Sequence, residues 1–267
     1  MIELYNSFTA YLQGFLFGIY PYICMGVFLI GSLIRFDRDQ YTWRSGSSQL
    51  LRAKQLRWGS NLFHYSIIFL FFGHLIGLLT PHWGYEWAIR PETKQLLAVY
   101  SGGAAGIVCF IGLSMLLHRR LYDPRIRRTS TFADMAILVL LWVQLTLGLI
   151  TLPFSLGHED AGIMLALASW SQAILTFQAR ASELVIGLPF PYLAHLVLGM
   201  TLFLLTPFSR LVHIFSAPVW YLFRAWQIVR VRGGATTRPG PVMPPGMVAP
   251  PARPLPADMR PNVSVVE

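Results

Sequence analysis

Five long apolar runs, separated by connections that hold most of the charged residues, constrain this chain more than any other feature. Each run approaches or exceeds the roughly 18–20 apolar residues that a helix needs to cross a bilayer. The chain is 54% hydrophobic and only 12% charged, whereas a soluble domain carries about 25% charged residues. We therefore predict an all-α membrane protein, a bundle of five transmembrane helices. The predicted spans cover residues of about 5–34, 60–80, 95–117, 132–154 and 189–216.

The distribution of basic residues predicts the orientation of the bundle. Arginine and lysine are concentrated in residues 35–58 and 118–131 and again after residue 217, and they are sparse in 81–94 and 155–188. Connections rich in basic residues stay in the cytoplasm, so we expect a periplasmic N-terminus and a cytoplasmic C-terminus. The net charge of +9 then reflects topology. We expect a lipid membrane, and no nucleic acid, as a partner.

Two segments fall outside this pattern. Residues 161–177 are apolar and almost long enough to cross, but a sixth span would place the basic segment after it outside. We expect instead a helix that lies on the outer surface or packs over the bundle. Residues 233–267, with nine prolines, are predicted to be a disordered cytoplasmic tail after a membrane domain of residues 1–232. The N-terminus has no basic segment before its apolar run, so we expect an uncleaved first span.

Four histidines lie inside two of the predicted spans, His64 and His74 in the second and His195 and His213 in the fifth. An ionisable side chain in hydrocarbon is costly, so it usually has a function and a partner nearby. Two histidines on each of two helices are the minimum set that holds two haems from both faces. The two cysteines form no CxxCH motif, so any haem would be bound non-covalently, by side chains such as histidine.

The depth of each histidine predicts which ones pair. With a rise of about 1.5 Å per residue, His64 lies roughly 6 Å and His74 roughly 21 Å from the inner boundary. In a core of about 30 Å, His195 also lies about 21 Å from that boundary, and His213 lies close to it. Antiparallel packing therefore pairs His74 with His195 and His64 with His213. Eighteen residues separate His195 from His213, so we expect them to share a helix face, and a kink at Pro207 would improve the inner match.

Two axial histidines leave no open position on iron, which favours electron transfer over oxygen binding. Gly73 and Gly199, next to two of the ligands, would give clearance for a flat macrocycle. The alternative is that the histidines are ordinary bundle residues or relay protons in a haem-free transporter. The remaining histidines, at span ends or in loops, are predicted to be interfacial or solvated: His82, His118 and His158.

Three long motifs resemble the cytochrome b (gamma) subunit of membrane-bound respiratory nitrate reductase. They are NLFH…GHLIGLLTPHW (61–83), FDRDQYTWRSGSSQLL (36–51) and HLVLGMTLFLLTPFSRLVHI (195–214). The resemblance extends from about residue 12 to 232 and includes YLFRAWQIVRVR (221–232). Residues 155–188 match the family poorly, and the tail lies outside it.

The resemblance implies five transmembrane helices and two haem b groups in the bacterial inner membrane. His64 and His213 match the ligands nearer the cytoplasm, and His74 and His195 match the outer ligands. Lys94 matches a lysine implicated in quinol oxidation beside the outer haem, although a lysine at a span end can also simply extend toward water. Electrons from menaquinol or ubiquinol would pass through both haems to an iron–sulfur beta subunit and a molybdenum alpha subunit that reduces nitrate. A dihaem cytochrome b of another cytoplasm-facing reductase remains an alternative.

Overall fold

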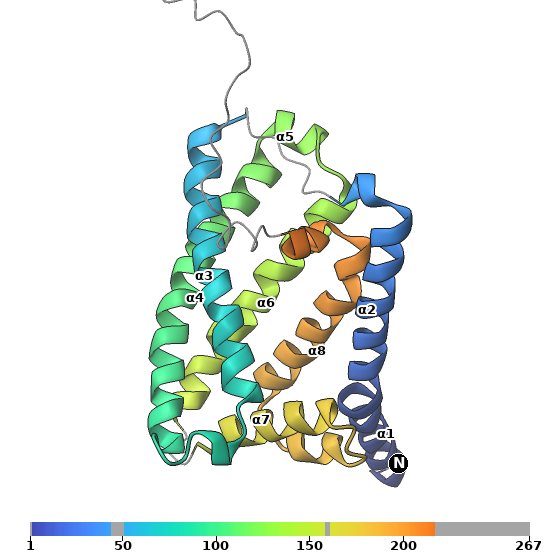
Figure 1. The fold of residues 1–267 in the computed structure, drawn as a ribbon, viewed down its shortest axis with the longest axis vertical. Coiled ribbons are helices and arrows are strands. Elements are labelled where there is room, and N and C mark those ends of the chain that lie inside the picture. The colour runs from blue at the N-terminus through green and yellow to red at the C-terminus, as the bar shows by residue number, and fades with distance from the viewer. Residues whose placement is uncertain (1, 44–50, 158–160, 217–267) are drawn as a thin grey trace, which may run out of the picture. The chain divides into compact units, whose positions relative to one another are not determined.

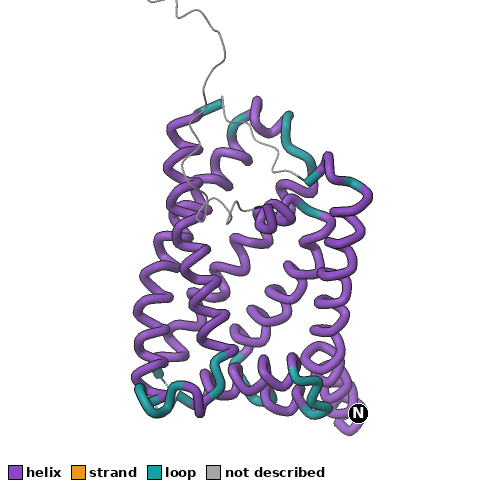
Figure 2. The backbone as a smooth tube through the Cα atoms, viewed as in Figure 1, coloured by secondary structure: helices purple, strands orange, loops and turns teal. Residues whose placement is uncertain are grey.

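The computed structural model describes residues 2–43, 51–157 and 161–216, and this part of the chain is helical with no β-strand. Its loops are short and lie at the ends of the long helices (Figure 2). The α-helices are α1 (Ile2–Gly14), α2 (Tyr20–Arg38), α3 (Ala53–Leu79), α4 (Pro91–Tyr122), α5 (Pro124–Arg128), α6 (Phe132–Leu156), α7 (Gly162–Leu175) and α8 (Phe190–Leu205).

Five helical segments of the described chain are long and apolar enough to cross a membrane, which confirms the predicted fold class. They are Phe8–Arg38, Ala53–Leu79, Pro91–Tyr122, Phe132–Leu156 and Phe190–Phe208. The second and third begin several residues before the predicted starts. The orientation of the termini stays a prediction, and the predicted domain boundary after residue 232 lies outside the described residues.

The long helices pack in the order α3–α4–α6–α8–α2 (Figure 1). Within the described chain, α3 and α8 have no extended packing contact with each other. Helices α3 and α8, which carry three of the four predicted ligands, are therefore connected through α4 and α6.

Helices α3 and α4 pack together more closely than any other pair of described helices, because glycines remove side-chain bulk between the two backbones. A Cβ atom at Gly112 would lie 2.6 Å from the backbone nitrogen of Phe63, and one at Gly59 would lie 3.2 Å from the carbonyl oxygen of Gly112. An ion pair between Arg52 and Asp123, 2.5 Å from Nε to Oδ2, joins the start of α3 to the end of α4.

The Asp123 carboxylate also caps α5, where it accepts hydrogen bonds from the backbone amides of Arg125 and Ile126. Desolvation alone would raise the pKa of Asp123, but these amides and Arg52 outweigh it and hold the pKa below its ordinary value. The stabilising contribution of the Asp123 carboxylate therefore depends on its being ionised.

Helix α7 does not cross the membrane, because its 14 residues are too few. It packs against α3 and against the 3₁₀ turn Ala181–Val185, and its Trp170 joins Phe17 and Val185 in the buried apolar cluster. The indole Nε1 of Trp170 donates to the carbonyl oxygen of Phe17, at 2.9 Å, inside the π-helical turn Phe15–Ile19. This agrees with the expectation of a helix packed over the bundle.

The fifth span departs from the prediction of one continuous helix over residues 189–216. The α-helix ends at Leu205, a 3₁₀ turn covers Thr206–Phe208, and Ser209 is extended before a second 3₁₀ turn, Arg210–Ser216. Pro207 has no N–H to donate, so the helical hydrogen bonding stops there. The argument that five whole turns place His195 and His213 on one helix face is therefore wrong.

Candidate functional site

The structure brings the four histidines together as two pairs. The ring centroids of His74 and His195 lie 6.2 Å apart with the ring planes inclined at 36°. Those of His64 and His213 lie 6.4 Å apart, inclined at 69°. These are the pairs expected from depth in the membrane, and the second forms although His213 lies beyond the end of α8.

Each imidazole is oriented by a backbone carbonyl that accepts a hydrogen bond from its Nδ1. The four contacts are His64 to Ser60 at 2.7 Å, His74 to Leu70 at 2.8 Å, His195 to Gln144 at 3.0 Å and His213 to Arg210 at 2.6 Å. A carbonyl only accepts, so Nδ1 carries the proton in each ring. The Nε2 atom of each neutral ring then keeps its lone pair for a metal.

The spacing of the rings fits haem iron. A bond of about 2 Å from the metal to each imidazole nitrogen, plus about 1 Å from that nitrogen to each ring centre, separates two opposed ring centres by about 6 Å. No group of three or more histidine, cysteine, aspartate or glutamate side chains among the described residues could hold a bare metal ion. Two ligands per level suffice only when a cofactor such as haem supplies the others. Coordination itself stays a prediction.

The glycines near the histidines differ in what they make room for. A Cβ at Gly73 would meet no atom of the described residues within 4 Å, so the space there is open, and its use by a macrocycle stays a prediction. A Cβ at Gly199 would lie 3.0 Å from Nε2 of Gln144, so Gly199 accommodates that side chain and the prediction that it clears a macrocycle is not supported. Gly148, which the sequence analysis did not select, faces the ring of His195 at 2.9 Å.

Lys94 lies at the start of α4 and contacts α3 within one turn of His74. Its Nζ donates to the carbonyl oxygen of Gly77 at 3.2 Å and lies 3.7 Å from the ring centre of Tyr85. The half-buried ammonium group is therefore held near the His74–His195 level. A hydrogen-bond donor with a positive charge at this place can bind a ligand oxygen on which negative charge develops.

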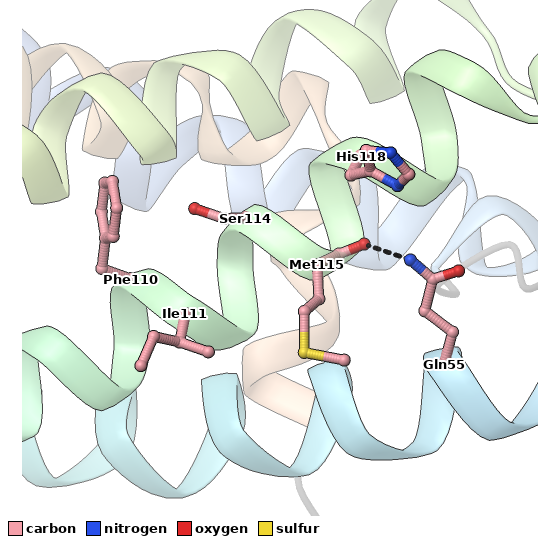
Figure 3. Close-up of a pocket in the computed structure, with 6 residues that line it drawn as sticks. All are labelled: Gln55, Phe110, Ile111, Ser114, Met115 and His118. Atoms are coloured by element: carbon pink, nitrogen blue, oxygen red, sulfur yellow. Dashed lines mark hydrogen bonds between the residues drawn. The ribbon is translucent and has the colours of Figure 1, made fainter.

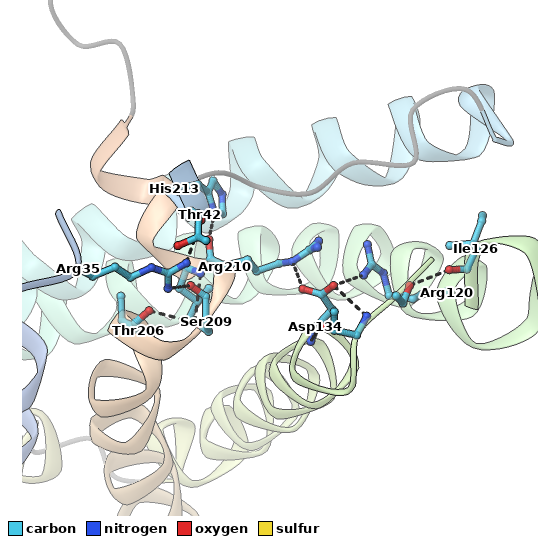
Figure 4. A network of polar contacts seen from close by, with 12 residues as sticks. Arg35, Thr42, Arg120, Ile126, Asp134, Thr206, Ser209, Arg210 and His213 are labelled. Atoms are coloured by element: carbon cyan, nitrogen blue, oxygen red, sulfur yellow. Dashed lines mark hydrogen bonds and ion pairs between the residues drawn. The ribbon is translucent and has the colours of Figure 1, made fainter. Parts of the chain in front are cut away.

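The turn that carries His213 is held by arginines (Figure 4). Arg35 on α2 donates to the carbonyl oxygens of Pro207 and Ser209, at 2.7 and 2.8 Å. Arg210 forms an ion pair with Asp134 at 2.7 Å. These contacts place the end of the fifth span over the start of α6.

Asp134 is itself well placed for this role. It completes a capping box with Thr131 at the N-terminus of α6, where the helix dipole favours a negative charge. Arg120 on α4 lies 3.6 Å from its second oxygen. The carboxylate thus ties α4, α6 and the His213 turn together.

The other histidines have different surroundings. His82 lies 3.1 Å from Glu86 near the surface, and His158 lies outside the described residues. His118 stacks on Tyr122 at 4.7 Å and lines a shallow, mainly apolar pocket of about 390 Å³ between α3 and α4 (Figure 3). None of the four paired histidines lines this pocket.

Gln144 is, with Gly148, a residue beside the site that the sequence analysis missed. It is a polar amide within the apolar run of α6, so the argument that selected the histidines applied to it as well. Arg35 and Asp134, which hold the His213 turn, could by contrast not be distinguished in the sequence from ordinary residues at span ends.

Comparison with known proteins supports the same interpretation. The family model described as nitrate reductase gamma subunit matches residues 13–232. The chain belongs to the nitrate reductase gamma subunit family. It is therefore a membrane subunit of an oxidoreductase complex, and its five apolar helices make it a multi-pass protein of the bacterial inner membrane.

Individual members of the family share much of this sequence. The chain is 53% identical over 222 residues to respiratory nitrate reductase 1 gamma chain of Escherichia coli strain K12, an alignment that covers 83% of this chain and 99% of the relative. It is 50% identical to respiratory nitrate reductase 2 gamma chain of the same strain, covering 83% and 98%. It is 36% identical to nitrate reductase gamma chain of Bacillus subtilis strain 168, covering 81% and 97%. Membership in a gamma-chain family implies alpha and beta partner subunits and favours nitrate reductase over the other functions considered.

Proposed function

We propose that this gamma subunit is a quinol-oxidising dihaem cytochrome b. One haem b would be held by His74 and His195 and the other by His64 and His213. The observation that carries the proposal is the pair of 6.2 and 6.4 Å separations between opposed imidazoles whose Nδ1 atoms are already engaged. Bound at these levels, haem supplies one-electron carriers between quinol and the iron–sulfur beta subunit, whose molybdenum-containing alpha partner reduces nitrate.

Two features of the chain suit it to electron transfer across the membrane. With two histidines bound to it, the iron of each haem would have no coordination position left for oxygen. His64 and His74 are ten residues apart on α3, so the two levels differ by about 15 Å in height. Charge that crosses part of the bilayer works against the membrane potential, which amounts to about 2.3 kcal/mol per elementary charge and 100 mV.

Lys94 is the proposed quinol-binding residue near the His74–His195 level. Its ammonium group would donate a hydrogen bond to a quinol oxygen and stabilise the negative charge that develops as that oxygen loses its proton. The carbonyl of Gly77 and the ring of Tyr85 hold the ammonium group in place. With a periplasmic N-terminus, the protons would leave to the outside.

The test begins with the haem content of the purified complex of full-length subunits. A reduced-minus-oxidised spectrum, with haem quantified per gamma chain, should give two b haems. His74→Ala should lose one of them and quinol oxidation, while nitrate reduction with an artificial donor to the soluble subunits continues. His118→Ala is the matched control, because His118 is a span histidine that pairs with no other histidine among the described residues, and it should keep both haems. A His74→Ala complex with two haems would disprove the ligand assignment.

A further inference from the structure

His195 differs from the other three paired histidines in how its ring is oriented. The Nδ1 atoms of His64, His74 and His213 bond to carbonyls three or four residues earlier in their own segments. That of His195 bonds instead to the carbonyl of Gln144, on α6. The orientation of this one imidazole therefore depends on a neighbouring helix.

The contact between α6 and α8 is reciprocal at this point. The ring of His195 lies against Gly148, where a Cβ would come within 2.9 Å of its Cε1. The side chain of Gln144 lies against Gly199, where a Cβ would come within 3.0 Å of its Nε2. Each helix thus carries a large polar side chain and, one turn later, the glycine that admits the side chain of the other helix.

The side-chain amide of Gln144 also contacts Nε2 of His195, the ring nitrogen that would bind iron. Its Nε2 donates to the carbonyl oxygen of His195 at 3.0 Å and lies 3.4 Å from the ring Nε2. Its Oε1 is buried and has no hydrogen-bond partner in the described structure. A buried acceptor without a partner is unfavourable, so it is the contact of the amide nitrogen with His195 that accounts for this side-chain position.

We propose that Gln144 and Gly148 are positioning residues that hold His195 and adjust the redox potential of the haem it binds. This inference rests on the proposed dihaem function. Gly148 lets the ring approach α6, and the backbone carbonyl of Gln144 then fixes the rotation of the ring through Nδ1. The N–H end of the Gln144 amide, next to that nitrogen, stabilises the extra negative charge of the reduced state. Removal of the amide should therefore lower the midpoint potential of this haem alone.

The experiment uses the full chain in complex with its partner subunits. Gln144→Leu removes the side-chain amide but keeps the backbone carbonyl. Thr146→Val is its control, because the hydroxyl of Thr146 donates, among the described residues, to the carbonyl of Trp142 on the same helix, at 2.8 Å. Gly148→Ala inserts the Cβ against His195, and Gly102→Ala is its control, because a Cβ there meets no atom within 4 Å. Redox titration and low-spin electron paramagnetic resonance spectra report on each haem, and His74→Ala identifies the signal that belongs to the His74–His195 level.

We expect Gln144→Leu to keep both haems and to lower the midpoint potential of the His74–His195 haem only. Gly148→Ala should lose that haem or change its low-spin spectrum, and both controls should match the unaltered complex. Equal effects on the two haems, or an unchanged potential in Gln144→Leu, would overturn the inference even if Gly148→Ala fails to assemble. An unaltered complex without haem would overturn the proposed function itself, so the two failures can be told apart.

Discussion

Gly112→Ala is the most informative substitution outside the site, because Gly112 on α4 lies where a new Cβ would come closest to the backbone of α3. The new Cβ would lie 2.6 Å from the backbone nitrogen of Phe63, 2.9 Å from the carbonyl oxygen of Gly59 and 2.9 Å from the Cβ of Leu62. An ordinary contact begins at 3.4 Å. The Phe63 nitrogen must therefore retreat by about 0.8 Å, the difference between 3.4 and 2.6 Å. Backbone atoms cannot rotate away, so α3 itself must move.

Overpacking of this kind costs about 1–3 kcal/mol, and here it falls on the residue next to His64. We expect Gly112→Ala to lower the thermal unfolding midpoint and the haem content, with a larger loss at the His64–His213 level than at the His74–His195 level. The assay is haem per gamma chain in the purified complex, followed by a thermal melt monitored at the haem absorption band.

Gly102→Ala is the matched control for this prediction. It makes the same substitution on the same helix, but the new Cβ meets no atom within 4 Å. Helix propensity alone changes its stability by about 1 kcal/mol or less, in the stabilising direction. If the two variants have the same melting midpoint and the same haem content, the tight α3–α4 contact does not control the position of His64.

Three further perturbations test other parts of the molecule. Lys94→Met should slow quinol oxidation while both haems stay visible in the difference spectrum; unchanged quinol kinetics would remove Lys94 from the site. Asp134→Asn removes the negative charge that pairs with Arg120 and Arg210, so the haem at the His213 level should be released first on heating. The folded-state pKa of Asp123 is lowered, so its contribution to stability is present above its unfolded pKa of about 3.9 and disappears as the pH falls through the folded value. Thermal melts at pH 5 and pH 3 should therefore differ more for the unaltered protein than for Asp123→Asn.

Much of the fold, and the pairing of the histidines in the candidate site, could be predicted from the sequence. Apolar runs of sufficient length define the five spans, because in hydrocarbon a backbone must satisfy its own hydrogen bonds as a helix. The depth of His64, His74 and His195 followed from a constant rise per residue. The length of a span and the depth of a residue in it depend on residues that are close together in the chain, so both can be predicted from the sequence alone.

The tertiary structure alone decided how the site is held. The sequence indicated a kink at Pro207 but not the full break after it, and the hydrogen bond from Arg35 to the carbonyl of Pro207 exists only because α2 lies alongside. Gln144 and Gly148 act on His195 from a helix about fifty residues away in the chain, and Lys94 meets Gly77 only because α3 and α4 pack together. Hydropathy and periodicity assign a residue to a helix face, but the partner across an interface is set by how closely two backbones approach, and that distance exists only in the folded bundle.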